Sequence, residues 1–326
     1  MMRKDPLIVI AGPTASGKSE LAAELARRIR GEVVSADSMQ VYRHMDIGSA
    51  KVTLEEMLGV PHHMIDVAEP DEAMDAARYA EMANECIRGI YERGHVPVLC
   101  GGTGFYIQAV TQGIHFTEMD PDPAYREKLW EIAGTKGSGA LHAMLSAVDP
   151  ESAEAIHENN IKRVIRALEF YKETGQKMSA HNEEEKKRVS PFDLVYFVVT
   201  DDRDILYERI DRRVDFMIRA GLYDEVAYLK AMGLTRSCVS MQGIGYKEML
   251  DVLDGRTDFE EAVRLIKRSS RHYAKRQITF FKRVQGAVWL NRQDFGGDTM
   301  RILEAMIRYI ETHTDIRAEE VGDPYE

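Results

Sequence analysis

The stretch that decides the fold reads Leu7-Ile8-Val9-Ile10-Ala11 and continues as Gly12-Pro13-Thr14-Ala15-Ser16-Gly17-Lys18-Ser19. Its first part is a short apolar run, which is typical of a buried parallel strand. Its second part matches the pattern G-x-x-x-x-G-K-S/T of a phosphate-binding loop (P-loop), and helical periodicity follows to about Arg30. Strand, loop and helix in this order are the context that the motif requires, so the sequence predicts a site for a polyphosphate.

The residue types of the P-loop indicate how such a site works. Glycines permit tight turns, so backbone N–H groups converge on phosphate oxygens at a helix N-terminus. Lys18 adds a positive charge, and the Ser19 hydroxyl is predicted to help hold Mg²⁺, the cofactor that we expect. The motif does not say which polyphosphate binds, and phosphoryl transfer from ATP is the first alternative.

Further strands and helices alternate after the P-loop. Apolar runs at residues 33–37, 63–67 and 96–100 predict three more strands, and helical periodicity covers about 76–93. The alternation predicts an α/β fold in which a P-loop-containing parallel sheet core is flanked by helices. The carboxyl ends of such strands line one crevice, so Asp37 and the loop Gly101-Gly102-Thr103 are expected to face the P-loop.

The pattern changes after Gly113. Residues 122–188 show helical periodicity only, and one strong strand is predicted at 192–199. Helices are then expected to the end of the chain, including 204–220 and 259–281. These patterns predict a helical domain inserted into the core. The predicted bounds are 1–118 and 190–314 for the core, 119–189 for the insertion, and 315–326 for an acidic tail.

The charge distribution bears on the kind of partner. The net charge of −11 argues mildly against a nucleic acid. Residues 262–283, however, contain no acid and are predicted to form an amphipathic helix with one basic face, which favours contact with phosphate groups. The cations of this segment are Arg264, Lys267, Arg268, Arg271, Lys275, Arg276, Lys282 and Arg283.

The cysteines and the apolar runs bear on the compartment. Cys86, Cys100 and Cys238 are widely spaced and show no metal-ligand pattern, as is typical of a reducing cytosol. No apolar run has membrane-spanning length, and residues 1–6 do not read as a signal peptide. We expect a cytoplasmic protein that has no membrane partner and acts as a monomer.

Taken together, the motifs resemble the tRNA dimethylallyltransferase (tRNA isopentenyltransferase) family up to about Val284. The resemblance rests on an ordered set that is far more specific than a P-loop alone. Its members are Gly12–Ser19, Asp37-Ser38-Met39-Gln40-Val41-Tyr42, Asp46-Ile47-Gly48, Gly101-Gly102-Thr103-Gly104-Phe105-Tyr106-Ile107, Arg163-Val164-Ile165-Arg166-Ala167-Leu168-Glu169, Gln242-Gly243-Ile244-Gly245-Tyr246-Lys247, and Ala274-Lys275-Arg276-Gln277-Ile278-Thr279.

The resemblance implies a reaction and a set of site residues. The P-loop would bind the pyrophosphate of dimethylallyl pyrophosphate rather than ATP. The acceptor would be N6 of the adenosine immediately 3′ of the anticodon, in tRNAs that read codons beginning with U. Asp37 would be the general base, with Thr103 and Arg126 as further active-site contacts. The residues implied to face the anticodon stem-loop are Asp37, Ser38, Met39, Gln40, Lys162, Arg163, Arg166, Gln242, Gly243, Gly245, Tyr246, Lys247, Lys275, Arg276, Gln277 and Lys282.

This chemistry suits the residue types. The exocyclic amine of adenine is a poor nucleophile, and a carboxylate such as Asp37 can take its proton as the C–N bond forms. Lys18, Arg126, backbone amides and Mg²⁺ would stabilise the departing pyrophosphate. The adenine must leave its stack to reach a pocket, where Gln40 is expected to bond its edge. No covalent enzyme intermediate is expected.

Three alternatives stay open on the sequence alone. A small-molecule P-loop kinase shares the first strand, loop and helix. It does not explain the glycine-threonine loop (Gly101-Gly102-Thr103) or the basic helix predicted at residues 262–283. A prenyltransferase of free adenine nucleotides is disfavoured by the insertion and the basic helix. A non-enzymatic RNA-binding protein is disfavoured by the intact Lys18, Ser19 and Asp37.

Overall fold

The computed structural model describes residues 4–114, 122–186 and 188–319. The chain divides into two compact units, Met1–Thr111 with Ser190–Glu326, and Gln112–Val189. The helical insertion is thus a unit of its own. The predicted boundary between residues 118 and 119 lies outside the described residues, as does most of the acidic tail.

The larger unit is built on a six-stranded sheet with the strand order β3-β2-β4-β1-β5-β6. Every neighbouring pair is parallel, as predicted. Ala11 pairs with Gly101 on one side and with Val198 on the other, so the carboxyl ends of the central strands meet at one edge. The strands are β1 (Pro6–Ala11), β2 (Gly31–Ala36), β3 (His62–His63), β4 (Val96–Gly101), β5 (Asp193–Thr200) and β6 (Val288–Asn291).

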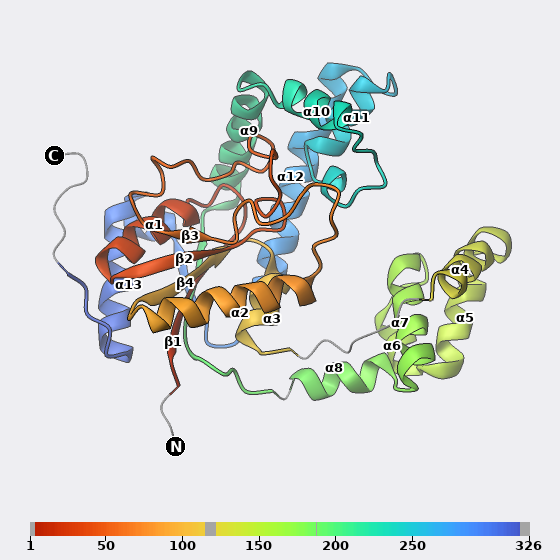
Figure 1. Ribbon diagram of the computed structural model, residues 1–326, viewed down its shortest axis with the longest axis horizontal. Coiled ribbons are helices and arrows are strands. Elements are labelled where there is room, and N and C mark those ends of the chain that lie inside the picture. The colour runs from red at the N-terminus through yellow and green to blue at the C-terminus, as the bar shows by residue number, and fades with distance from the viewer. Residues whose placement is uncertain (1–3, 115–121, 187, 320–326) are drawn as a thin grey trace. The chain divides into compact units, whose positions relative to one another are not determined.

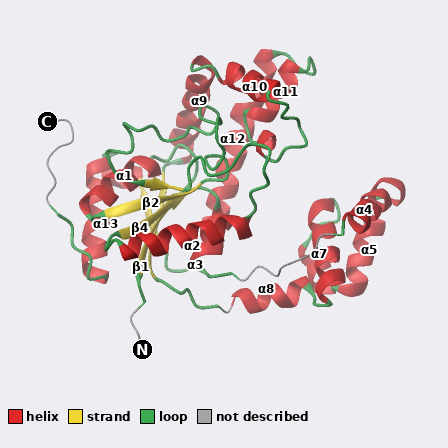
Figure 2. Cartoon of the chain, viewed as in Figure 1, coloured by secondary structure: helices red, strands yellow, loops and turns green. Residues whose placement is uncertain are grey.

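Helices cover both faces of this sheet (Figures 1 and 2). In β1, Ile8 and Ile10 pack with α1 (Lys18–Arg28) and α13 (Thr299–His313). Leu7 and Val9 point to the opposite face and join the core formed with α2 (Ala76–Glu92), α3 (Gly104–Thr111) and α12 (Phe259–Phe281). Burial on both faces explains why β1 reads as an unbroken apolar run.

The remaining helices of the larger unit follow β5. They are α9 (Arg203–Arg219), α10 (Leu222–Ala231), α11 (Tyr246–Leu253), and the short 3₁₀ helices η1 (Ser240–Gln242) and η2 (Arg292–Phe295). Within the described residues, no helix is long and apolar enough to cross a lipid bilayer.

The regular structure described in the smaller unit consists of helices. It has its own core, in which Leu129, Leu141 and Leu168 are buried. Asp122 caps its first helix by accepting a hydrogen bond from Tyr125 N, with a proline at the helix start. Its helices are α4 (Pro123–Lys136), α5 (Ser138–Val148), α6 (Pro150–Ala155), α7 (Ile161–Thr174) and α8 (Met178–Lys186).

Two predictions about the sheet were wrong. The strand expected at 63–67 is only His62–His63, because Met64 and Asp66 adopt φ values of 63° and 55°, which no strand accommodates. The end of the chain was expected to be helical throughout, yet β6 lies between α12 and α13 and extends the sheet beside β5. It has only four residues, so its apolar run is too short to stand out.

Candidate active site

The P-loop connects β1 to α1 and packs tightly against its neighbours. A Cβ added to Gly12 would lie 2.3 Å from the carbonyl oxygen of Val199, so only glycine fits there. Gly17 has a φ of 83°, in the left-handed region that favours glycine. The Ser16 hydroxyl is buried and has no hydrogen-bond partner among the described residues. A buried donor of this kind is suited to a phosphate oxygen.

Lys18 begins α1 with its side chain buried below the loop. Its ammonium group donates a hydrogen bond to the Pro13 carbonyl oxygen at 3.4 Å. Burial lowers the pKa of Lys18, and the nearby carboxylate of Asp37 acts in the opposite direction. An anionic ligand at the loop would favour the charged form of this lysine further.

Two adjoining cavities open beside the P-loop. The smaller, of about 50 Å³, is lined by Lys18, Ser19 and Gln40 among others. The larger, of about 400 Å³, has mainly apolar walls. The residues that line both are Thr14, Asp37, Ser49 and Arg213. The apolar walls of the larger cavity include Met39, Met74, Ile210, Val214, Met217 and Ile266.

Asp37 lies between the two cavities because of the sheet register. It follows β2 directly, and Ala36 pairs with Gly101 of β4. One carboxylate oxygen of Asp37 accepts a hydrogen bond from Met39 N at 2.9 Å. The Thr103 hydroxyl accepts one from Ser38 N at 3.0 Å. The structure therefore brings Asp37 and Thr103 to the same edge of the sheet as the P-loop.

Arg213 is a site residue that sequence reasoning missed. It belongs to α9, and its guanidinium donates a hydrogen bond to the Ala50 carbonyl oxygen at 3.4 Å. Burial lowers the pKa of Arg213, and the carboxylate of Asp37 opposes this effect. One feature of the sequence could have identified Arg213. It is a charged residue on the apolar face of α9 that Leu206, Ile210 and Val214 form.

Gln277 has a role different from the predicted tRNA contact. Its side chain is buried, and its amide donates to the Gly102 carbonyl oxygen at 2.8 Å and accepts from Thr14 N at 2.9 Å. It thus ties the P-loop to the glycine-threonine loop. Tyr273, one helical turn away on α12, lines the larger cavity, and burial raises its pKa to about 12.

Gln40 and Tyr246 are also buried rather than free to meet RNA. The Gln40 amide accepts from the Ser35 hydroxyl at 3.1 Å and donates to the Ala50 carbonyl oxygen at 3.1 Å. Both ends of this amide therefore already have partners. The Tyr246 hydroxyl donates to Glu225 at 2.8 Å.

Other residues predicted to face tRNA do line the larger cavity. They are Ser38, Met39, Gln242, Gly243, Lys247 and Arg276. Gly245 is set apart from them, since it precedes α11 with a φ of 98° and donates from its N–H to Glu248 at 2.8 Å.

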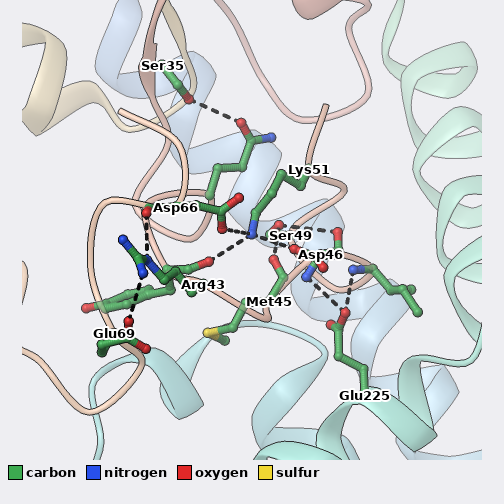
Figure 3. Close-up of polar contacts among 12 residues, drawn as sticks. Ser35, Arg43, Met45, Asp46, Ser49, Lys51, Asp66, Glu69 and Glu225 are labelled. Atoms are coloured by element: carbon green, nitrogen blue, oxygen red, sulfur yellow. Dashed lines mark hydrogen bonds and ion pairs between the residues drawn. The ribbon is translucent and has the colours of Figure 1, made fainter. Parts of the chain in front are cut away.

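A loop held by Glu225 forms part of the cavity wall (Figure 3). The Glu225 carboxylate accepts hydrogen bonds from the backbone N–H groups of Asp46, Ile47 and Gly48 at 2.9, 2.7 and 3.0 Å. Lys51, at the end of the loop, contacts Asp46 and Asp66 at 2.5 Å each. The loop in turn presents Gly48 and Ser49 to the larger cavity and the Ala50 carbonyl oxygen to Gln40 and Arg213.

The basic segment on α12 is only partly available for a partner. Arg264 pairs with Glu261, Lys267 with Asp215 and Arg271 with Asp211. These three cations are therefore partly neutralised by acids on α12 itself and on α9, which the prediction did not foresee. Other cations are exposed and show no ion pair within the described part of the chain. They include Lys275, Arg276, Lys282 and Arg283.

The predicted site residues of the smaller unit lie on α4 and α7. Lys162, Arg163 and Arg166 are exposed on α7. Arg126 on α4 forms a two-pronged contact with Glu169, at 2.6 and 2.9 Å. Its predicted approach to the P-loop involves both units and stays a prediction.

The residues around the P-loop suit a hard cation that shares its ligands with a phosphate. Ser19 and Asp37 supply hydroxyl and carboxylate oxygens to the smaller cavity, and oxygen ligands are what Mg²⁺ prefers. No cluster of three or more His, Cys, Asp or Glu side chains arranged for a metal occurs in the described residues. Ser19 is accordingly the side chain that would hold Mg²⁺, with substrate oxygens and water completing the shell.

The fold and site define an α/β protein with a P-loop motif, in which a carboxylate lies between a small cavity beside that loop and a larger, mainly apolar cavity. Residues 40–284 match the family described as IPP transferase. The chain is 53% identical over 305 residues to the tRNA dimethylallyltransferase of Lachnoclostridium phytofermentans, covering 94% of this chain and 97% of that protein. It is 48% identical over 295 residues to that of Halalkalibacterium halodurans, covering 90% and 94%. The chain belongs to the tRNA dimethylallyltransferase family.

Solved structures agree with this assignment. The crystal structure of the full-length tRNA isopentenylpyrophosphate transferase from Bacillus halodurans superposes with a TM-score of 0.71 at 46% identity, covering 95% of this chain and 98% of that one. A eukaryotic dimethylallyltransferase acting on tRNA gives a TM-score of 0.82 at 29% identity, covering 97% and 81%.

Proposed function

We propose that this protein transfers the dimethylallyl group of dimethylallyl pyrophosphate to N6 of an adenosine in tRNA. The acceptor is the adenosine immediately 3′ of the anticodon in tRNAs that read codons beginning with U. The observation that carries the proposal is the place of Asp37, a carboxylate that lines both the phosphate cavity and the apolar cavity.

The smaller cavity is suited to the pyrophosphate. Lys18 and Arg213 line it; Lys18 is buried, Arg213 is half-buried, and an anion would balance both charges. The buried Ser16 hydroxyl supplies a further donor. These groups are fixed before the reaction, so they stabilise the negative charge that develops on the leaving group. Mg²⁺ held at Ser19 would supply additional positive charge to the same oxygens.

The larger cavity is suited to the dimethylallyl group and the adenine. Its methionine and aliphatic walls match a five-carbon hydrocarbon. The N6–C1 bond forms as the C1–O bond to pyrophosphate breaks, and Asp37 accepts the proton that N6 loses. Thr103 holds the turn beside Asp37 through Ser38 N. Arg126 is proposed as a further contact to the pyrophosphate.

No side chain is needed as a covalent carrier of the prenyl group. Cys100 is the thiol of the phosphate cavity, and burial raises its pKa to about 12, so it stays protonated at neutral pH. We propose direct transfer. Trapping a prenyl group on the enzyme by mass spectrometry of the intact protein would contradict this step.

The tRNA is proposed to lie along the exposed cations of α12 and of α7, with its target adenine turned out of the loop. We propose a monomer as the working unit. The three free cysteines support the cytoplasm as its compartment.

The test is incubation of the protein with Mg²⁺, dimethylallyl pyrophosphate and unmodified tRNA that reads UUU codons, followed by mass spectrometry of the digested tRNA. Prenylation beside the anticodon by the wild type, and a rate about 10²- to 10⁴-fold lower in Asp37→Asn, is the expected result. Omitting Mg²⁺ should lower the rate as well. Prenylation of free AMP alone, or consumption of ATP, would replace the proposal with one of the other two enzyme classes.

A further inference from the structure

An exposed aromatic side chain stands beside the active-site turn. Phe105 is the second residue of α3 and follows Thr103 after a single glycine. Its side chain is 62% exposed, whereas Tyr106 and Ile107, the next residues of the helix, are buried. One exposed aromatic residue is ordinary by itself, so its surroundings decide what it does.

The ring of Phe105 is supported by a second aromatic ring. Its centroid lies 5.5 Å from that of Phe280 on α12, and the two planes are inclined by 55°. Phe280 in turn packs on the backbone of Gly104, where a Cβ would lie 2.3 Å from the ring. Phe281, which is buried, contacts Phe280 from the other side. Phe105 therefore leans on a fixed support at the junction of α3 and α12 (Figure 1).

Positive charge surrounds this pair of rings. Arg276 lies four residues before Phe280 on the same side of α12, and Arg283 lies two residues beyond the end of this helix. Lys282 is exposed at the end of the same helix, and no acid neutralises these three cations within the part of the chain that the structure describes. An exposed ring among unneutralised cations is typical of surfaces that bind single-stranded nucleic acid.

Residues of α12 lead from the larger cavity to this surface. Arg276 and Tyr273 line that cavity, and Phe280 follows one to two helical turns later. Phe105 approaches from the other side, because Thr103 belongs to the turn that positions Asp37. The ring thus lies close in sequence to Thr103 of the Asp37 turn and beside α12, a position suited to contact with the strand that carries the target adenine.

We propose that Phe105 is a stacking platform for an unpaired base of the anticodon loop next to the target adenine. When that adenine is turned out, its neighbour loses a stacking partner. The Phe105 ring replaces it, while the nearby arginines and Lys282 contact the flanking phosphates. Because every base has a π-face, the contact tolerates different loop sequences. This inference rests on the proposed tRNA substrate.

The experiment measures binding and turnover for Phe105→Ala and Phe105→Trp. The ligand is a tRNA anticodon stem-loop that carries 2-aminopurine beside the target adenine. Phe105→Ala should weaken binding about 5- to 150-fold and raise KM for tRNA by a similar factor. It should leave KM for dimethylallyl pyrophosphate, kcat at saturating tRNA and the Tm unchanged. Phe105→Trp should retain the affinity and the quenching of 2-aminopurine.

Phe216→Ala is the matched control, since Phe216 on α9 is 64% exposed and does not line either cavity. Its tRNA affinity should equal that of the wild type. If Phe105→Ala binds the stem-loop as tightly as the wild type does, the proposed stacking role of Phe105 is wrong, even when the wild type prenylates tRNA. If the wild type binds the stem-loop through Phe105 but prenylates no tRNA, the proposed function fails and the platform stands.

Discussion

At the scale of single residues, two cations that line the smaller cavity are withdrawn from solvent, Lys18 almost fully and Arg213 in part. Lys18 and Arg213 both have pKa values lowered by burial, and both have Asp37 as a neighbouring opposite charge. Such groups cost stability in the free protein and gain a partner when an anion binds. In the proposed reaction Asp37 accepts a proton, and a bound pyrophosphate that occupies the two cations would leave the carboxylate free for that task.

We predict that Arg213→Gln lowers kcat about 10²- to 10³-fold, because it removes one fixed charge from the developing pyrophosphate. Arg213→Lys should recover part of the rate, since it restores the positive charge but lacks the planar guanidinium group that donates paired hydrogen bonds. Steady-state kinetics with saturating tRNA measure both. The matched control is Arg212→Gln, because Arg212 is the exposed neighbour in α9 and pairs with Glu208 on the helix surface. Equal rates in Arg213→Gln and the wild type would remove Arg213 from the site.

At the scale of elements, loops that lack regular structure are positioned by side chains from distant helices. Glu225 of α10 binds the backbone of residues 46–48 (Figure 3). Gln277 of α12 binds both the P-loop and the loop after β4. These contacts join residues more than 170 positions apart along the chain. Binding loops of this enzyme are therefore only as well placed as the helices that support them.

Glu225→Gln is expected to weaken this support, because an amide nitrogen cannot accept the hydrogen bonds that a carboxylate oxygen accepts from backbone N–H groups. We expect kcat/KM for tRNA prenylation to fall about 10-fold or more, since the loop carries a wall of the cavity and the carbonyl partner of Arg213. Tyr246→Phe removes one bond to the same carboxylate and leaves the backbone bonds in place. It should have the smaller effect, and the reverse order would contradict the role of Glu225.

A second element junction lies at the amino-terminal ends of the strands. Glu32 of β2 is 2% exposed and contacts Arg93, His63 and His95, which lie at the end of α2, in β3 and before β4. Hydrogen bonds from Arg93 lower the pKa of Glu32 from 4.5 to about 2. A lowered folded-state pKa contributes stability above about pH 4.5 that is lost as the pH falls towards 2.

Glu32→Gln should therefore lower the free energy of unfolding by about 2 kcal/mol at pH 7. The difference from the wild type should shrink between pH 4.5 and pH 2, where Glu32 itself becomes protonated. Urea denaturation over this pH range measures it. A difference that stays constant with pH would show that the carboxylate charge does not stabilise the fold.

How far the sequence predicts these features depends on how local they are. The P-loop, β1 and α1 follow from one continuous stretch and are described correctly by it. The strand expected at 63–67 is wrong because Met64 and Asp66 are held in the left-handed region by their surroundings. Arg213, the support from Gln277 and the pairing of Arg271 with Asp211 depend on contacts between α9, α12 and the loops, which residue patterns along one segment do not contain.

At the scale of the whole molecule, the net charge of −11 conceals an uneven surface. Acids on α9 neutralise Lys267 and Arg271, while Lys275, Arg276, Lys282 and Arg283 stay exposed towards the end of α12. Attraction of a polyanion depends on this local potential rather than on the total. The acidic protein and its proposed RNA substrate are therefore compatible.

We predict that Lys282→Ala lowers the slope of log K against log salt concentration for tRNA binding by about one. Lys267→Ala should leave the slope unchanged, because Lys267 already contacts Asp215 at 2.6 Å. Binding measured by filter retention between about 50 and 200 mM salt distinguishes the two. Equal slopes for Lys282→Ala and the wild type would remove Lys282 from the RNA surface.

The position of Gln277 has a consequence for how the two substrates communicate. The helix α12 carries exposed cations on its surface and also the buried Gln277 amide, which accepts a hydrogen bond from the P-loop backbone. We expect a displacement of α12 by RNA to reach the P-loop through Gln277, because this side chain contacts the loop directly. Thermodynamic reciprocity then requires that occupancy of the P-loop changes the affinity for RNA by the same factor. Gln277 is therefore the residue through which binding of one substrate is expected to alter the affinity for the other.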